Sequence, residues 1–157
     1  MSSMPDTQST VDADDISRFN SQAGEWWDPD GPMKPLHLFT PVRLEYILSA
    51  ARRTELIADQ PDRLFPLDGR KVLDVGCGGG LLAEPLCRLG AEITAIDASQ
   101  GAIDVAKAHA ASQGLSITYQ NMPIETLAKT PTMQGNFDLI YASEIIEHVN
   151  NLSLIHI

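Results

Sequence analysis

An apolar strand that runs directly into glycines constrains the fold of this chain more than any other segment. Residues 72–80 read V-L-D-V-G-C-G-G-G, and a helix-like pattern follows. Glycines let the main chain turn tightly and approach a ligand closely, and they leave the first amides of the next helix facing the crevice. A strand, a glycine loop and a helix in this order predict a cofactor site, although a simple turn remains the alternative for a loop alone.

A carboxylate after the next predicted strand favours the cofactor site. Asp97 follows a β-rich segment, 92–96, and comes about 20 residues after Gly76, where a doubly wound sheet places an acid beside a bound ribose. Its two oxygens can accept hydrogen bonds from both ribose hydroxyls. The alternative is that Asp97 caps the helix that starts near Ser99. The shared spacing, strand end and glycine loop favour the ribose role.

The glycine spacing also indicates which cofactor binds. The pattern is G-x-G-x-G, and Leu81 stands where nicotinamide-dinucleotide proteins have glycine or alanine. Asp74, inside the strand, resembles the acidic position of the first motif of class I methyltransferases. The sequence therefore favours S-adenosylmethionine, and an NAD-dependent oxidoreductase is the alternative.

The remaining sequence alternates between the two kinds of element. Helices are expected over residues 80–89, 99–113 and 124–129, and strands over 71–75, 92–96, 116–119 and 137–142. This βαβαβ order implies an α/β fold with a doubly wound parallel sheet.

The chain divides into three predicted parts. Residues 1–11 are polar and are expected to form a disordered tail. Residues 12–60 are expected to form a helical cap segment, with one helix from Asp12 or Asp14 and another from Pro41 to about Ala58. Prolines between Trp26 and Pro41 predict irregular structure there. Residues 70–157 are expected to form the cofactor-binding half domain.

Several short motifs resemble those of one family, the bacterial ubiquinone biosynthesis O-methyltransferases. They are W-W-D at 26–28, K-P-L-H at 34–37, P-V-R-L at 41–44, the glycine segment at 74–80 and E-I-I-E-H-V at 144–149. The resemblance covers roughly residues 12–150. It implies a Rossmann-like class I methyltransferase sheet with seven strands in the order 3-2-1-4-5-7-6. This sequence is expected to supply strands 1 to 4 of that sheet and to be truncated at its C-terminus.

The resemblance also implies an activity and a set of cofactor contacts. Members transfer a methyl group from S-adenosylmethionine to a phenol or catechol hydroxyl of a polyprenylated ubiquinone precursor, at the 2-polyprenyl-6-hydroxyphenol and 3-demethylubiquinone steps. By the family pattern Arg43, Gly76, Asp97 and Ser143 contact the cofactor, and the loop adds Gly78. A guanidinium suits the methionyl carboxylate because the two can pair through two hydrogen bonds. An inert cofactor-binding fragment is a further alternative.

An acidic and histidine cluster follows the last predicted strand. Glu144, Glu147 and His148 are spaced i, i+3 and i+4 and share one face if this segment is helical. They could hold Mg²⁺, which would lower the pKa of a catechol hydroxyl. His148 could instead act as a general base. A solvated helix face is the third interpretation.

Charge and the N-terminal residues bear on partners and location. The chain has 21 acidic and 11 basic side chains, for a net charge of -10, which disfavours nucleic acid as a partner. The N-terminus has neither an apolar signal region nor the arginines of a presequence, so a cytoplasmic location is expected. Peripheral contact with the inner membrane and contact with other ubiquinone biosynthesis proteins are left open.

Overall fold

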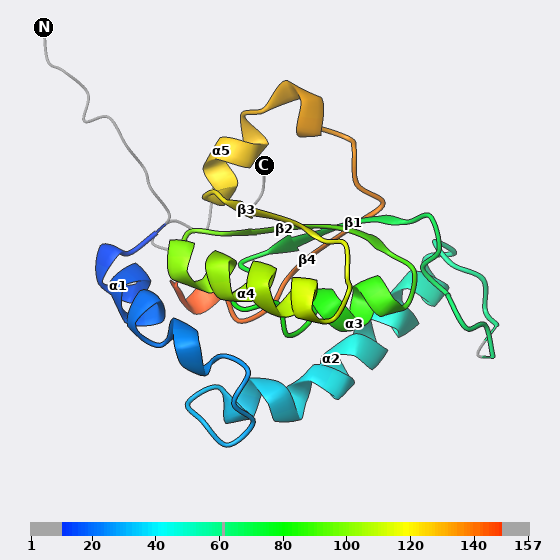
Figure 1. The fold of residues 1–157 in the computed structure, drawn as a ribbon. Coiled ribbons are helices and arrows are strands. Elements are labelled where there is room, and N and C mark those ends of the chain that lie inside the picture. Colours follow the sequence, from blue (N-terminus) through cyan, green and yellow to red (C-terminus); the bar gives the residue numbers. More distant parts are fainter. Residues whose placement is uncertain (1–10, 61, 149–157) are drawn as a thin grey trace, which may run out of the picture.

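A four-stranded parallel sheet is the centre of this computed structural model, which describes residues 11–60 and 62–148. The strand order is β3-β2-β1-β4 (Figure 1). The strands are β1 (Lys71–Val75), β2 (Glu92–Asp97), β3 (Thr118–Asn121) and β4 (Leu139–Ala142). The predicted α/β class and the parallel, doubly wound arrangement are confirmed.

Helices cover both faces of this sheet. They are α1 (Ala13–Ser21), α2 (Lys34–Arg53), α3 (Ala83–Arg88), α4 (Gln100–Ser112) and α5 (Ile124–Ala128). Short 3₁₀ turns span Ala23–Glu25, Pro131–Met133 and Ile146–His148. Figure 1 shows α2, α3 and α4 on one side of the sheet and α5 on the other. None of the described helices has the length and apolarity that a transmembrane span requires.

The central strand is buried on both faces because its side chains alternate between two apolar clusters. Val72 packs with residues from β2, α2, α3 and α4, whereas Leu73 packs with Ile96 and Leu127 on the opposite face. Burial of both faces explains the near-continuous apolar run of β1.

The register of the sheet brings the predicted site together. Val75 of β1 pairs with Ile96 of β2 on one side and with Ala142 of β4 on the other. Parallel strands end at the same edge, so the glycine loop, Asp97 and the segment after β4 all emerge side by side.

The predicted elements agree with the structure, with shifts at their ends. Ser99 caps α4 through its hydroxyl, which accepts a hydrogen bond from the amide of Ala102, as predicted. Strand β3 runs two residues later than expected, and β4 begins at Leu139 instead of residue 137.

The prediction for residues 26–41 is partly wrong, since α2 begins at Lys34 and not at Pro41. Pro35 lies in the first turn, where no intrahelical donor is required, but Pro41 lies inside the helix. Tertiary contacts favour the extra turns: His37 Nε2 is 2.8 Å from the carbonyl oxygen of Trp26, and Leu36 packs in the same cluster as Trp26. The helix also ends at Arg53, earlier than predicted.

The three-part division of the chain stays a prediction. The expected tail lies outside the described residues except for Val11, and residues 149–157 of the expected half domain also lie outside them.

Candidate functional site

A cavity of about 970 Å³ opens at the carboxyl ends of β1, β2 and β4. Its wall includes side chains from α1, α2 and the segment after β3 as well as the glycine loop. All the site residues predicted from the sequence line it: Arg43, Gly76, Gly78, Asp97, Ser143, Glu144, Glu147 and His148. The fold therefore gathers these residues from distant parts of the chain around one space.

The glycine loop needs glycine for two separate reasons. Gly76 and Gly78 have φ values of 74° and 53°, in the left-handed region that disfavours residues with a Cβ. A Cβ on Gly78 would also lie 2.3 Å from the ring of Trp26, and a Cβ on Gly76 would overlap the side chain of Ile145. The loop is thus in close contact with side chains from both ends of the described chain.

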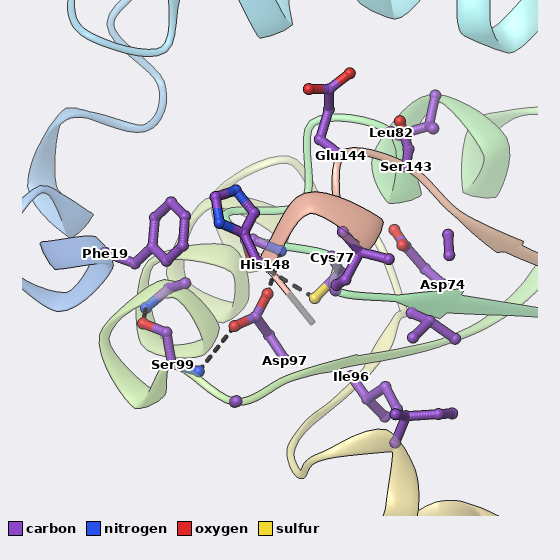
Figure 2. Close-up of a pocket in the computed structure, with 18 of the residues that line it drawn as sticks. Phe19, Asp74, Cys77, Leu82, Ile96, Asp97, Ser99, Ser143, Glu144 and His148 are labelled. Atoms are coloured by element: carbon purple, nitrogen blue, oxygen red, sulfur yellow. Dashed lines mark hydrogen bonds between the residues drawn. The ribbon is translucent and has the colours of Figure 1, made fainter. Parts of the chain in front are cut away.

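Asp97 links the loop to the start of α4. Its Oδ2 accepts a hydrogen bond from the Gly78 amide and its Oδ1 accepts one from the Ser99 amide, both at 2.8 Å (Figure 2). Burial raises the pKa of Asp97, and the two amide bonds oppose that rise. The cap of α4 is Ser99, so the alternative role of Asp97 as the helix cap is wrong.

Asp74 supplies a second carboxyl group to the wall, and this one is buried. Its side chain is 2% exposed, and the Tyr141 hydroxyl donates a hydrogen bond to its Oδ2 at 2.7 Å. Burial raises the pKa of Asp74 to about 7, a rise that the Tyr141 hydrogen bond opposes and the nearby Asp97 charge increases. Asp74, the acidic residue of the glycine motif, is therefore buried among the strands and lies close to Asp97.

Arg43 reaches the cavity from α2. Its guanidinium forms an ion pair with Glu144 and lies 5.7 Å from the centre of the Phe39 ring. Its side chain is 23% exposed, so it is held between the helix and the cavity. In this structure the Glu144 carboxylate is the anion that Arg43 binds.

The predicted metal set is not brought together, and this corrects the sequence analysis. Glu144 has a φ of 57°, which breaks the expected helix, and only Ile146–His148 form a short 3₁₀ turn. Glu144 pairs with Arg43, whereas His148 Nδ1 lies 2.9 Å from Asp15 Oδ2. Within residues 11–60 and 62–148, no three His, Cys, Asp or Glu side chains form a group that could hold a metal ion. The residues do not fit Mg²⁺.

His148 is placed by α1 at the N-terminal end of the described chain. Asp15 contacts its ring nitrogen, and the Phe19 ring packs edge-on against the imidazole at 5.4 Å (Figure 2). Arg18 holds the other carboxylate oxygen of Asp15 at 2.9 Å. Sequence reasoning missed Asp15 and Phe19 because they lie more than 100 residues from His148 and share no motif with it.

Trp26 was also missed as a cavity residue. It is 6% exposed, and its ring covers Gly78 and Gly79. The tryptophan pair beside an acidic residue was a usable signal, because two adjacent large rings require apolar cover.

Comparison with known proteins identifies a matching family and relatives that are longer than this chain. A family described as "Methyltransferase domain" matches residues 72–156. The ubiquinone biosynthesis O-methyltransferase of Ruegeria sp. (strain TM1040) is 44% identical over 146 residues, which cover 90% of this chain and 56% of that protein. The protein of the same name from Bartonella tribocorum is 44% identical over 153 residues, with coverages of 95% and 58%. This chain spans a little more than half the length of these relatives.

Solved structures share the fold. The magnesium protoporphyrin IX methyltransferase (ChlM) from Synechocystis PCC 6803, with bound SAM, superposes with a TM-score of 0.60 at 23% identity and covers 90% of this chain and 66% of its own. The YcgJ protein of Bacillus subtilis superposes with a TM-score of 0.52 at 22% identity, with coverages of 70% and 42%. At these identities the likeness concerns the arrangement of strands and helices.

Proposed function

This chain belongs to the methyltransferase domain family, and from that membership we propose that it forms the cofactor-binding part of an S-adenosylmethionine-dependent O-methyltransferase. Its sheet has the Rossmann-like class I methyltransferase arrangement. The family match removes the NAD-dependent oxidoreductase as an alternative. An inert cofactor-binding fragment remains the competing proposal.

One observation carries the cofactor assignment: a glycine loop and the half-buried carboxylate of Asp97 meet in a single cavity. The side chain of Ile145 lies where a Cβ on Gly76 would be, and the ring of Trp26 lies where a Cβ on Gly78 would be. Neighbouring groups can therefore come into direct contact with the backbone of this loop. Asp97 uses one hydrogen bond per oxygen, and each carboxylate oxygen has a second lone pair for a ribose hydroxyl. These features fit an adenosyl ligand that contacts Gly76, Gly78 and Asp97.

The amino-acid end of the cofactor has a matching cation. Arg43 already binds a carboxylate in the cavity, that of Glu144, and the methionyl carboxylate would take the same place. Ser143 directly precedes Glu144 on the cavity wall and completes the proposed set of cofactor contacts.

His148 is the proposed general base. S-adenosylmethionine supplies a methyl group on a sulfonium that needs no further activation, so the protein has to align and deprotonate the acceptor. Asp15 faces Nδ1 of His148, which leaves Nε2 as the atom that takes the proton from a phenol. No step through a metal ion is proposed, because Glu144, Glu147 and His148 do not form a metal site here.

The acceptor class comes from the relatives. Proteins 44% identical to this chain are named ubiquinone biosynthesis O-methyltransferases. We propose a polyprenylated phenol or catechol as the substrate of the whole protein, in the cytoplasm with peripheral contact at the inner membrane where such a substrate resides. The net charge of -10 is the reason for proposing no nucleic-acid partner.

Calorimetry with S-adenosylhomocysteine tests the cofactor assignment. Asp97→Asn should raise the dissociation constant for S-adenosylhomocysteine at least about tenfold, because an uncharged amide cannot accept charge-assisted hydrogen bonds from the ribose hydroxyls. Asp104→Asn is the matched control, since Asp104 is exposed on α4 and bonds only Gln100 in the described structure. Equal affinities for both variants and the parent would refute the assignment.

A methyl-transfer assay on a soluble catechol separates the enzyme from the inert fragment. His148→Gln should lower kcat by about 100-fold or more and leave the affinity for S-adenosylhomocysteine within about twofold. Tight cofactor binding without any transfer by the parent chain would favour the fragment.

A further inference from the structure

The tryptophan pair contacts the glycine loop in two different ways. Trp26 covers Gly78 and Gly79 with its ring, and its own Nε1 has no hydrogen-bond partner among the described residues. Trp27 Nε1 donates a hydrogen bond to the carbonyl oxygen of Gly79 at 3.0 Å, across 52 residues of sequence. One indole therefore packs on the loop and the other holds one of its peptide groups.

The bond from Trp27 fixes a peptide group whose other end is also fixed. The carbonyl of Gly79 shares its peptide plane with the amide of Gly80, and that amide donates to the carbonyl oxygen of Cys77 at 3.0 Å. Gly80 has a φ of 91°, so its backbone has little preference of its own for this orientation. The bond from Trp27 and the bond from Gly80 to Cys77 together limit rotation of this peptide.

The Trp27 ring is held in turn from the side of α4. The ring of His109 stacks on it with centroids 3.5 Å apart and planes 6° apart. His109 Nδ1 lies 2.7 Å from the carboxylate of Glu84, which is 2% exposed, and Arg88 approaches the second oxygen of Glu84 at 3.8 Å. A buried acceptor thus fixes the imidazole, and the imidazole fixes the indole.

We infer that Trp27 is a positioning residue for the glycine loop, which it orders for cofactor binding through the bond to Gly79, with His109 and Glu84 holding the indole in place. The part that concerns cofactor affinity rests on the proposed function. The part that concerns loop order does not, because it refers to the ligand-free protein.

Amide hydrogen exchange in the ligand-free chain is the first test. Trp27→Phe keeps an aromatic ring beside His109 but removes the donor, so the Gly80 amide should exchange about three- to tenfold faster. Trp26→Phe removes no hydrogen bond but opens space at a buried position, so it should lower Tm more than Trp27→Phe and change Gly80 exchange less. A positioning role for Trp27 therefore predicts opposite orders: Trp26→Phe has the larger effect on Tm, and Trp27→Phe has the larger effect on Gly80 exchange.

Calorimetry with S-adenosylhomocysteine is the second test. Trp27→Phe should weaken binding about three- to tenfold, and in the assay it should raise KM for the cofactor more than it lowers kcat. If exchange and affinity instead follow the loss of Tm across the two variants, Trp27 is merely structural and the inference is overturned. A parent protein that does not bind S-adenosylhomocysteine contradicts the proposed function, and the exchange result still decides the role of Trp27.

His109→Gln provides a second variant if Trp27→Phe does not fold. Glutamine can still donate to Glu84 but offers no ring to stack on Trp27, so Gly80 exchange should rise in the same direction by a smaller factor. Unchanged exchange in this variant would contradict the supporting role of His109 and Glu84.

Discussion

At the scale of single residues, two of the carboxyl groups on the cavity wall, those of Asp97 and Asp74, have different surroundings. The Asp97 carboxylate accepts hydrogen bonds from two backbone amides, whereas that of Asp74 accepts one, from the Tyr141 hydroxyl, within the described part of the chain, and is buried among strands. Burial raises the pKa of both groups, and it raises that of Asp74 to about 7. A buried carboxyl with so high a pKa carries its proton through the acidic range and should make stability depend on pH.

Asp74→Asn should remove that dependence. The folded protein holds the Asp74 proton up to about pH 7, whereas the unfolded chain releases it near 3.8. Between these values the folded state binds more protons, so this group makes stability fall as pH rises, by up to about 1.4 kcal/mol per pH unit. Chemical unfolding from pH 4 to 8 should show a smaller decline for the variant than for the parent. Parallel curves for both proteins would contradict the high pKa.

At the scale of elements, α2 shows how tertiary contacts override a helix breaker. Pro35 occupies the first turn at no cost, but Pro41 removes a donor in the middle of the helix. The Thr40 hydroxyl bonds the carbonyl oxygen of Leu36 at 2.8 Å, one turn earlier, and the Arg43 side chain beyond Pro41 reaches the cavity. The helix continues through Pro41 because both of its ends pack on the rest of the fold.

Replacement of the two prolines should therefore have unequal effects. Pro41→Ala restores a helical donor at an exposed position and should stabilise the protein by about 1 to 3 kcal/mol. Pro35→Ala gains no hydrogen bond and should change stability by less than about 0.5 kcal/mol. Urea unfolding measures both values. A destabilised Pro41→Ala would mean that the proline sets a bend the packing needs.

At the scale of the whole molecule, the sheet has an apolar edge. Strand β4 pairs only with β1 among the described residues, and its Ile140 is 60% exposed. Parallel strands are normally covered on both sides, and an open apolar edge favours pairing with another chain. The net charge of -10 opposes association between copies of the chain, but it leaves the backbone of the β4 edge open to pairing.

The 157-residue chain is accordingly expected to self-associate through β4. Ile140→Lys should shift sedimentation toward the monomer, because a charge on an edge strand discourages pairing. Leu64→Lys is the control, since Leu64 is 75% exposed but lies outside the strands. A parent chain that stays monomeric at every concentration measured would rule out this expectation.

The glycine loop and Asp97 were predictable because the signal is local. Turn-forming glycines after a strand, and a carboxylate at the end of the next strand, follow from backbone geometry over about 20 residues. The contacts of His148 with Asp15 and of Arg43 with Glu144 were not predictable, because each joins residues more than 100 positions apart. The metal set failed for the same reason, since Glu144 and His148 found partners elsewhere and Glu144 left the helical conformation.

The sequence by itself determined the parallel α/β sheet and the edge of the sheet at which the glycine loop and Asp97 lie, because periodicity and glycine positions act over short distances. The strand order came from the family resemblance. Only the tertiary structure decided where α2 begins, which carboxylate faces Arg43 and which indole holds Gly79. Those outcomes depend on which side chains meet when distant segments pack, and no local pattern encodes that choice.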